Sequence, residues 1–298
     1  MAPGRRGRLR PGGVRAGRGR ARGDPGAGGG GRRRAVDQPY APLAGRRLPG
    51  AGGRGGSRVT ISRRRVRAIA LKELYEYRRN AAIFGTMAIL PLIFLIQPLI
   101  QVFALPASAA TALRHEHTLL YLLAIPVLVP AVPAAYAVVG ERLQGTLEPV
   151  LATPISRREL LLGKALAAFI PSVAIAYGVF ALFVAVVEMF ARPAIASAFI
   201  RGPELLAQLL FTPPLAAWSV WVGIAVSARA RDPRTAAQLA LLLSLPTVVV
   251  TTLIAVNVIP ATLLVALVLG SVLLIADFLG WRAASAVLDR ERLISGIT

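Results

Sequence analysis

The sequence predicts an all-α integral membrane protein with six transmembrane helices and both termini in the cytoplasm. Three observations lead to this fold class. Hydrophobic residues make up 55% of the 298-residue chain, and the mean hydropathy is +0.61. Charged side chains are absent from several intervals long enough to cross a bilayer, and basic residues gather in alternate loops. The chain has no cysteine, which excludes disulfides, thiolate metal sites and cysteine nucleophiles.

Residues 1–60 form a basic tail. They hold fifteen arginines against Asp24 and Asp37, and they show no apolar periodicity. Such a segment cannot bury enough surface to offset the entropy of ordering, so we expect a disordered extension without a secretory signal. The alternatives are an arginine-glycine arm for anionic lipid or RNA, and a later start at Val59 or Val66. Because most of the excess positive charge lies in this tail and the rest of the chain is strongly apolar, we expect no nucleic-acid partner.

Residues 62–79 predict an amphipathic helix before the first span. Its apolar positions recur at helical spacing: Val66, Ile69, Ala70, Leu74 and Tyr77. Such a helix is expected to lie along the inner membrane surface. A positively charged flank that only orients the first span is a compatible interpretation.

Residues 61–298 are predicted to form the transmembrane domain. Five long intervals lack charge: 80–113, 118–140, 165–187, 205–228 and 235–276. The last interval is twice the length that one helix requires, and a turn at 257–260 divides it into spans near 236–256 and 260–281. Prolines recur in the spans, so we expect kinked or broken helices, although membrane helices tolerate single prolines. They are Pro91, Pro98, Pro126, Pro130, Pro133, Pro171, Pro213, Pro214 and Pro246.

The loops predict the orientation. With a cytoplasmic N-terminus, the inner segments carry 17 basic residues and the outer ones carry only Arg114, Arg192 and Arg201. The excess of positive charge on one side therefore predicts that both termini lie in the cytoplasm, with the chain in the cytoplasmic membrane.

The first inner loop, residues 141–164, has local order. Ser156 and Glu159 are spaced as a capping box, which predicts a helix that starts at Arg157 and continues into the third span. Before them, Leu147, Val150 and Leu151 form a short apolar face ahead of Pro154. A short cytoplasmic helix that exposes such a face requires a partner protein.

At these residues the sequence resembles the membrane subunit of type-2 ABC exporters. The family stretch reads approximately E-x-x-x-G-T-L-E-x-L-L-x-x-P-[IV]-[ST]-R-x-E-[IL]-L-x-G-K. The matching residues are Glu141, Gly145, Thr146, Leu147, Glu148, Leu151, Pro154, Ile155, Ser156, Arg157, Glu159, Leu160, Gly163 and Lys164. Val150 departs from the usual leucine. The resemblance extends over residues 62–292, with AIALKELYEYRRN and SARARDPRTAAQL as further matching segments.

The resemblance implies the permease half of an ATP-driven exporter. Its first inner loop would form a coupling helix against a separate ATPase subunit, and a second permease, identical or paralogous, would complete a dimer in the lipid bilayer. ATP and Mg²⁺ would bind the partner, because Gly163-Lys164-Ala165 lacks the remainder of a phosphate-binding loop. The coupling residues would be Glu141, Gly145, Thr146, Leu147, Glu148, Leu151, Pro154, Ile155, Ser156, Arg157, Glu159 and Lys164.

Four polar residues are candidate intramembrane sites: Gln97, Gln101, Glu188 and Asp277. Ionisable groups at membrane depth can mark a pathway, but we expect Glu188 to pair with Arg192 and Asp277 with Arg282. The run His115-Glu116-His117 lacks a third clear metal ligand, which favours a solvated loop. We therefore expect no metal site. Hydrolase motifs of the types H-E-x-x-H and G-x-S-x-G are absent from the sequence.

Two other functions stay open from the sequence. An ion-gradient-driven transporter would require inverted repeats and ionisable residues near the bilayer midplane, and neither is clear. A non-transporting anchor or assembly component would use the same ATPase contact. The apolar spans fit lipid-like compounds, drugs, glycan carriers and ions equally well as substrates.

Overall fold

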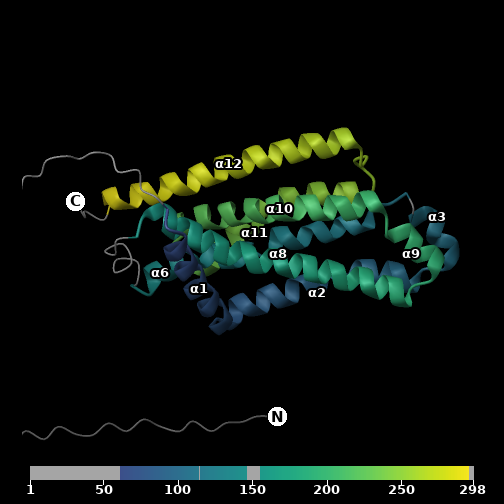
Figure 1. Cartoon of the computed structure of the whole chain (residues 1–298), viewed down its shortest axis with the longest axis horizontal. Coiled ribbons are helices and arrows are strands. Elements are labelled where there is room, and N and C mark those ends of the chain that lie inside the picture. The colour runs from purple at the N-terminus through teal and green to yellow at the C-terminus, as the bar shows by residue number, and fades with distance from the viewer. Residues whose placement is uncertain (1–60, 114, 146–154, 295–298) are drawn as a thin grey trace, which may run out of the picture. The chain divides into compact units, whose positions relative to one another are not determined.

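Six helices long and apolar enough to cross a membrane form the body of the protein (Figure 1). This computed structural model describes residues 61–113, 115–145 and 155–294, and within these ranges it contains no strand. The predicted all-α class and the six spans are confirmed. The spans are Ile83–Ala104, Thr118–Leu143, Arg157–Phe190, Gly202–Arg229, Pro233–Ala255 and Leu263–Ala286. The prediction for the tail, residues 1–60, lies outside the described residues.

The amphipathic helix α1 (Arg63–Arg79) precedes the first span, α2 (Ala81–Ala104). Of the predicted apolar face, Val66, Ile69, Ala70 and Tyr77 are buried, and Leu74 is half-buried. The 3.6-residue period therefore predicted most of the buried face correctly.

The second span is broken into four short helices. These are η2 (Thr118–Leu123), α4 (Ala124–Leu128), α5 (Ala131–Tyr136) and α6 (Val139–Leu143). Three prolines within 126–133 each remove one backbone donor, which explains why a continuous helix does not form here. By contrast, α8 (Arg157–Phe190) and α11 (Pro233–Ala255) continue through their single internal prolines.

The broken span is the most buried of the six, and α2, α8, α10 (Gly202–Arg229) and α11 pack around it. Irregular backbone at membrane depth requires such protein cover, because lipid offers no hydrogen bonds. Where α5 gives way to α6, the N–H groups of Val138 and Val139 donate to Ser227 Oγ on α10, each at 3.0 Å. Near this point, a Cβ on Gly223 would lie 2.5 Å from the Ala134 Cβ, so the α10 and α5 backbones are in close contact.

The last two spans are joined by the predicted turn. Helix α11 ends at Ala255, Asn257 adopts a left-handed conformation with φ of 58°, and α12 runs over Leu263–Ile294. Helix α12 packs mainly on α10 and borders one side of the bundle, shown in yellow in Figure 1. Three short helices gather at the end of the bundle opposite α1 and α6 (Figure 1), namely η1 (Ala107–Ala109), α3 (Ala110–Leu113) and α9 (Pro193–Phe199).

Candidate functional site

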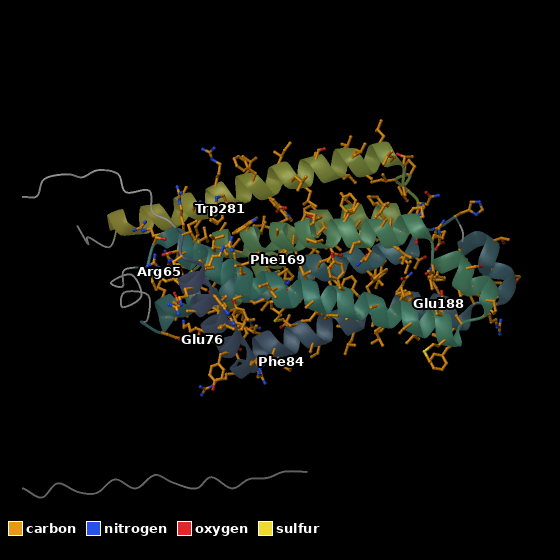
Figure 2. The ribbon with its side chains drawn as sticks, in the orientation of Figure 1. Arg65, Glu76, Phe84, Phe169, Glu188 and Trp281 are labelled. Carbon is orange, nitrogen blue, oxygen red and sulfur yellow. The ribbon has the colours of Figure 1, made fainter. Side chains whose placement is uncertain are left out.

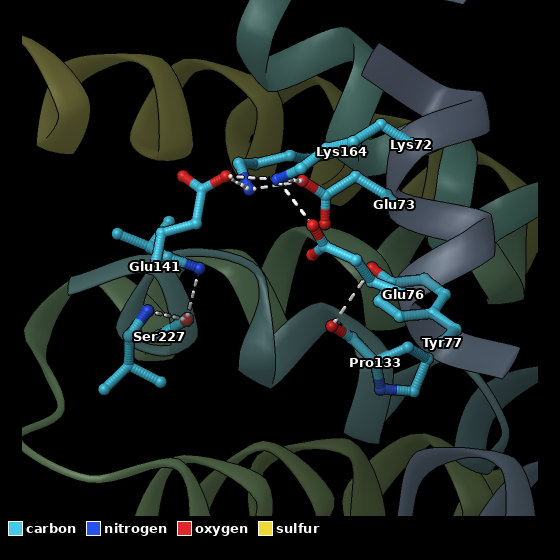
Figure 3. Close-up of polar contacts among 10 residues, drawn as sticks. Lys72, Glu73, Glu76, Tyr77, Pro133, Glu141, Lys164 and Ser227 are labelled. Carbon is cyan, nitrogen blue, oxygen red and sulfur yellow. Dashed lines mark hydrogen bonds and ion pairs between the residues drawn. The ribbon is translucent and has the colours of Figure 1, made fainter. Parts of the chain in front are cut away.

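A cluster of buried charges joins three helices at the α1 end of the bundle (Figure 3). Lys164 on α8 extends its Nζ to 2.9 Å from Glu73 Oε1 on α1 and to 2.8 Å from Glu141 Oε1 on α6. Lys72 Nζ lies 3.2 Å from the same Glu141 oxygen and 3.4 Å from Glu73 Oε1. We call Lys72, Glu73, Glu141 and Lys164 the inner-end cluster.

The inner-end cluster balances its own charge, with two carboxylates and two ammonium groups. Glu73, Glu141 and Lys164 are each at most 5% exposed. Burial alone would lower the pKa of Lys72, but a hydrogen bond to Glu76 and the charges of Glu73 and Glu141 outweigh it and raise the pKa above its usual range. Lys72 therefore stays charged and compensates the second carboxylate.

Tyr77 adds a link from α1 to the broken span. Its hydroxyl donates to the carbonyl oxygen of Pro133 at 3.4 Å (Figure 3). Burial, with the nearby charges of Glu73 and Glu76, raises the pKa of Tyr77 well above its usual value, so it remains a donor. A cavity of about 700 Å³ lies beside these groups, lined by Glu76, Tyr77 and other residues of α1 and α6.

The start of α8 is tied to the start of α1. Ser156 Oγ accepts from the Glu159 N–H at 3.3 Å, and Glu159 Oε2 accepts from the Ser156 N–H at 2.9 Å, so the predicted capping box and the start at Arg157 are confirmed. The other oxygen, Glu159 Oε1, accepts from the Ser62 N–H at 2.7 Å and from Arg65 at 2.8 and 3.0 Å. One carboxylate thus caps α8 and holds the N-terminus of α1.

At Gly163 the α8 backbone is in close contact with α1. A Cβ at this position would lie 2.5 Å from Ile69 Cγ2 and 2.6 Å from Ile69 Cβ. Only a glycine allows this crossing, which brings Lys164 within reach of Glu73.

The beginning of the inner loop is also anchored. Gly145 has φ of +66° and ends α6 in the left-handed region, where glycine carries no Cβ penalty. Arg142 donates to the carbonyl oxygens of Ala228 and Ala230, at 3.0 and 3.2 Å, at the C-terminus of α10. The loop therefore leaves the bundle from a fixed point.

At the described ends of the predicted coupling loop, the structure pairs Glu141 with Lys164 and, separately, Ser156 with Glu159. Ile155 and Arg157 are half-buried beside them. Thr146, Leu147, Glu148, Leu151 and Pro154, with the short helix predicted there, lie outside the described residues.

The polar residues within the spans do not come together. Gln97 is exposed on α2, while Gln101 Nε2 donates to Glu116 Oε2 at 3.3 Å. Glu188 lies near the far end of α8, well away from Arg65 and Glu76 (Figure 2). Asp277 is half-buried on α12.

The predicted ion pairs Glu188–Arg192 and Asp277–Arg282 are wrong. Neither pair is found among the ion pairs that the described residues form. Helix α8 ends at Phe190, so Arg192 is not one helical turn beyond Glu188. Asp277 and Arg282 are five residues apart, which places them on different faces of α12. Arg282 instead stacks over the Phe278 ring, one turn away, at 5.8 Å.

His117 is integrated into the end of the bundle opposite α1, contrary to the expected solvated loop. Its Nδ1 lies 2.9 Å from Glu204 Oε1 and 3.2 Å from Arg201 Nη2, and the backbone N–H of His117 donates to the Ala255 carbonyl at 2.8 Å. Arg201 also contacts Glu204 and the Glu116 carbonyl. These bonds connect the loop between the first two spans to α10 and α11.

Reasoning from sequence missed the role of Glu73, although a signal was available. Glu73 follows Val66, Ile69 and Ala70 and precedes Tyr77 on the same helical face, so its burial follows from the period. Its partners, Lys164 and Glu141, are distant in sequence, and no local pattern identifies them.

Comparison with known proteins gives one finding. A family model described as ABC-2 family transporter protein matches residues 67–281, which include most of α1, the described part of the first loop after the second span and nearly all six spans. A search of curated proteins finds no match.

Proposed function

We infer function from the premise that this chain belongs to the ABC-2 transporter family. It is the multi-pass membrane permease of an ABC transporter, and such a component is not itself catalytic.

We propose that the protein exports its substrate across the cytoplasmic membrane, with both termini inside, and that a separate ATPase subunit binds ATP and Mg²⁺. In this proposal the ATPase engages the loop between Glu141 and Lys164. The observation that supports it is the 2.8 Å ion pair between these two residues, which are the first and last of the loop. Because Lys164 also pairs with Glu73 on α1, a movement of the loop would displace α1, α6 and α8 together.

The transport step follows from these connections. When the ATPase dimer closes on ATP, the loop moves, and the buried inner-end cluster transmits that movement to α1, α6 and α8. Because α6 is the last piece of the broken second span, its movement changes the shape of the span around which the other helices pack. A path enclosed between the two permease copies then opens alternately to the two sides of the membrane.

Co-purification and flux measurements test this function. The full chain is solubilised from its native membrane, co-purifying chains are identified by mass spectrometry, and ATPase activity and ATP-dependent flux are measured after reconstitution. We expect an ATPase subunit to co-purify, and we expect Glu148→Ala or Gly145→Pro to uncouple ATP hydrolysis from transport. Ser197→Ala, an exposed position on α9, serves as the control.

Three results would contradict the proposal. Unchanged ATP-dependent transport in both loop variants would remove the role of the loop. Flux that depends on an ion gradient, with no ATPase co-purifying, would favour a secondary transporter, and an ATPase contact without flux would favour an anchor or assembly component.

A second permease copy is part of the proposal, and Gln97 supports it. An amide exposed to hydrocarbon is costly and is usually satisfied by hydrogen bonds between helices. In a two-fold dimer the Gln97 side chains of two copies can pair with each other. Since the chain has no native cysteine, Gln97→Cys should cross-link two copies, whereas Leu267→Cys on α12 is the control. Cross-linking of the control alone would place the interface elsewhere.

A further inference from the structure

A shallow apolar groove of about 370 Å³ lies between α10 and α11, at the end of the bundle that carries the inner loops. Its apolar lining comprises Val222, Ala225, Val226, Leu239 and Leu243. Leu239 and Leu243 are about half exposed, so the groove opens on the side of the bundle that faces the hydrocarbon. Arg229 lines the inner end of the same groove.

Basic residues lie at one end of the groove. Arg229 lines it, and Arg231 and Arg234 follow Ala230, the last groove residue on the α10 side, in the connection and first turn of α11. All three arginines are exposed, and only Asp232 opposes them in this connection. The Asp232 carboxylate is directed at the N-terminus of α11, where it accepts from the Thr235 N–H at 2.8 Å. This end of the groove therefore retains an excess of positive charge.

The C-terminus of α10 would ordinarily repel an anion at this place, because its last carbonyl oxygens carry partial negative charge. Here the guanidinium of Arg142 donates to the carbonyls of Ala228 and Ala230. Arg229 itself donates to the Ala225 carbonyl through Nη1 at 3.2 Å, and its other N–H groups extend from an exposed side chain.

We propose that this groove binds an anionic glycerophospholipid, with one acyl chain along the α10–α11 lining and the phosphate on Arg229 and Arg231. An apolar groove with a basic end at the cytoplasmic side is the arrangement that recognises such headgroups. The apolar lining selects a lipid over a soluble phosphate. The inner-leaflet location rests on the proposed orientation, whereas the binding chemistry does not depend on the ATPase or on transport.

Lipid titration of the isolated full chain tests the proposal. The protein is delipidated in detergent and titrated with phosphatidylglycerol or with phosphatidylcholine of the same acyl chains, and native mass spectrometry counts bound molecules. We expect preferential binding of phosphatidylglycerol. Replacement of Arg229 and Arg231 by glutamine should weaken that binding about fivefold per arginine, while Arg192→Gln at the outer end is the charge-matched control.

A second variant separates the lipid chain from the headgroup. Ala225→Phe fills the groove and leaves the arginines in place, so it should reduce binding of both lipids while the thermal unfolding midpoint of the lipid-free protein changes little. Equal binding of the two lipids, full competition by soluble glycerol phosphate, or unchanged binding in the arginine variant would overturn the proposal. Cross-linking of Leu243→Cys to a second protein chain would also overturn it and assign the groove to a protein contact.

Discussion

Lys164 is the residue on which the inner-end cluster most depends. Its side chain is 3% exposed and contacts Glu73 and Glu141, whereas the Lys72 side chain is 45% exposed. A buried ion pair gains little over well-packed apolar residues, but removal of one partner leaves an uncompensated charge. Replacement of Lys164 should therefore reduce the free energy of unfolding far more than replacement of Lys72, although both lysines contact the same carboxylates.

We expect Lys164→Met to lower the free energy of unfolding by about 3–5 kcal/mol, because two buried carboxylates lose their shared cation. Lys72→Met, the matched control, should cost less, about 1 kcal/mol, because the Lys72 side chain is half exposed and water can take the place of its ammonium group beside the carboxylates. Thermal and denaturant unfolding in detergent would measure both. Pairing Lys164→Met with Glu73→Gln should recover part of the loss, and no recovery would argue against their coupling.

Ser227 is a buried polar residue that stabilises the broken second span. Its hydroxyl accepts from two N–H groups that the break between α5 and α6 leaves without helical partners. Gly163 has a comparable role for α1 and α8, since its missing side chain permits the crossing with Ile69. At the scale of elements, these two residues determine where the broken span and the amphipathic helix lie.

Ser227→Ala should lower the free energy of unfolding by about 1–3 kcal/mol, the cost of buried backbone donors left unsatisfied. Ser271→Ala is the control, because Ser271 is exposed and bonds only to the Leu267 carbonyl of its own helix. Hydrogen exchange at Val138 and Val139 should quicken in the first variant only. An unchanged exchange rate would mean that these donors have another acceptor.

Gly163→Val should separate α1 from α8 and lower stability by about 1–3 kcal/mol, as overpacking does. Gly178→Ala on the same helix has open space around its Cβ and should be neutral or stabilising. Limited proteolysis within 62–79 measures the release of α1. Equal protection in the two variants would show that the crossing tolerates a side chain.

At the scale of the whole molecule, charge is divided between the two ends of the bundle. The end with α1 and α6 carries the basic segments around the inner-end cluster, and the opposite end carries Arg201, Glu204 and His117. The positive-inside rule therefore predicts which end faces the cytoplasm. Cysteine labelling is a direct test, because the chain contains no cysteine.

We expect a membrane-impermeant maleimide to label Ser197→Cys in intact cells, and Gln144→Cys only after the membrane is permeabilised. Both positions are exposed, and they lie near opposite ends of the bundle. The reverse pattern would overturn the predicted orientation, and with it the cytoplasmic location of the inner loop.

The sequence alone was sufficient for the spans and for several of their boundaries. The capping box at Ser156, the start at Arg157 and the turn at Asn257 all follow from interactions within a few residues. Hydropathy over a bilayer thickness likewise depends on composition and length, not on neighbours in space. These features are local, so a sequence read by itself determines them.

Only the tertiary structure decided which charges meet. Lys164 and Glu73 are separated by 91 positions, and their contact depends on a glycine crossing that no pattern in α1 or α8 reveals. The predicted ion pair of Glu188 was wrong because α8 ends before Arg192. That of Asp277 was wrong because a five-residue spacing places Arg282 on another face of α12, where it stacks over Phe278. Long-range ion pairs are set by the packing of helices, whereas helix formation in a membrane is set by local hydrogen bonding and hydrophobicity.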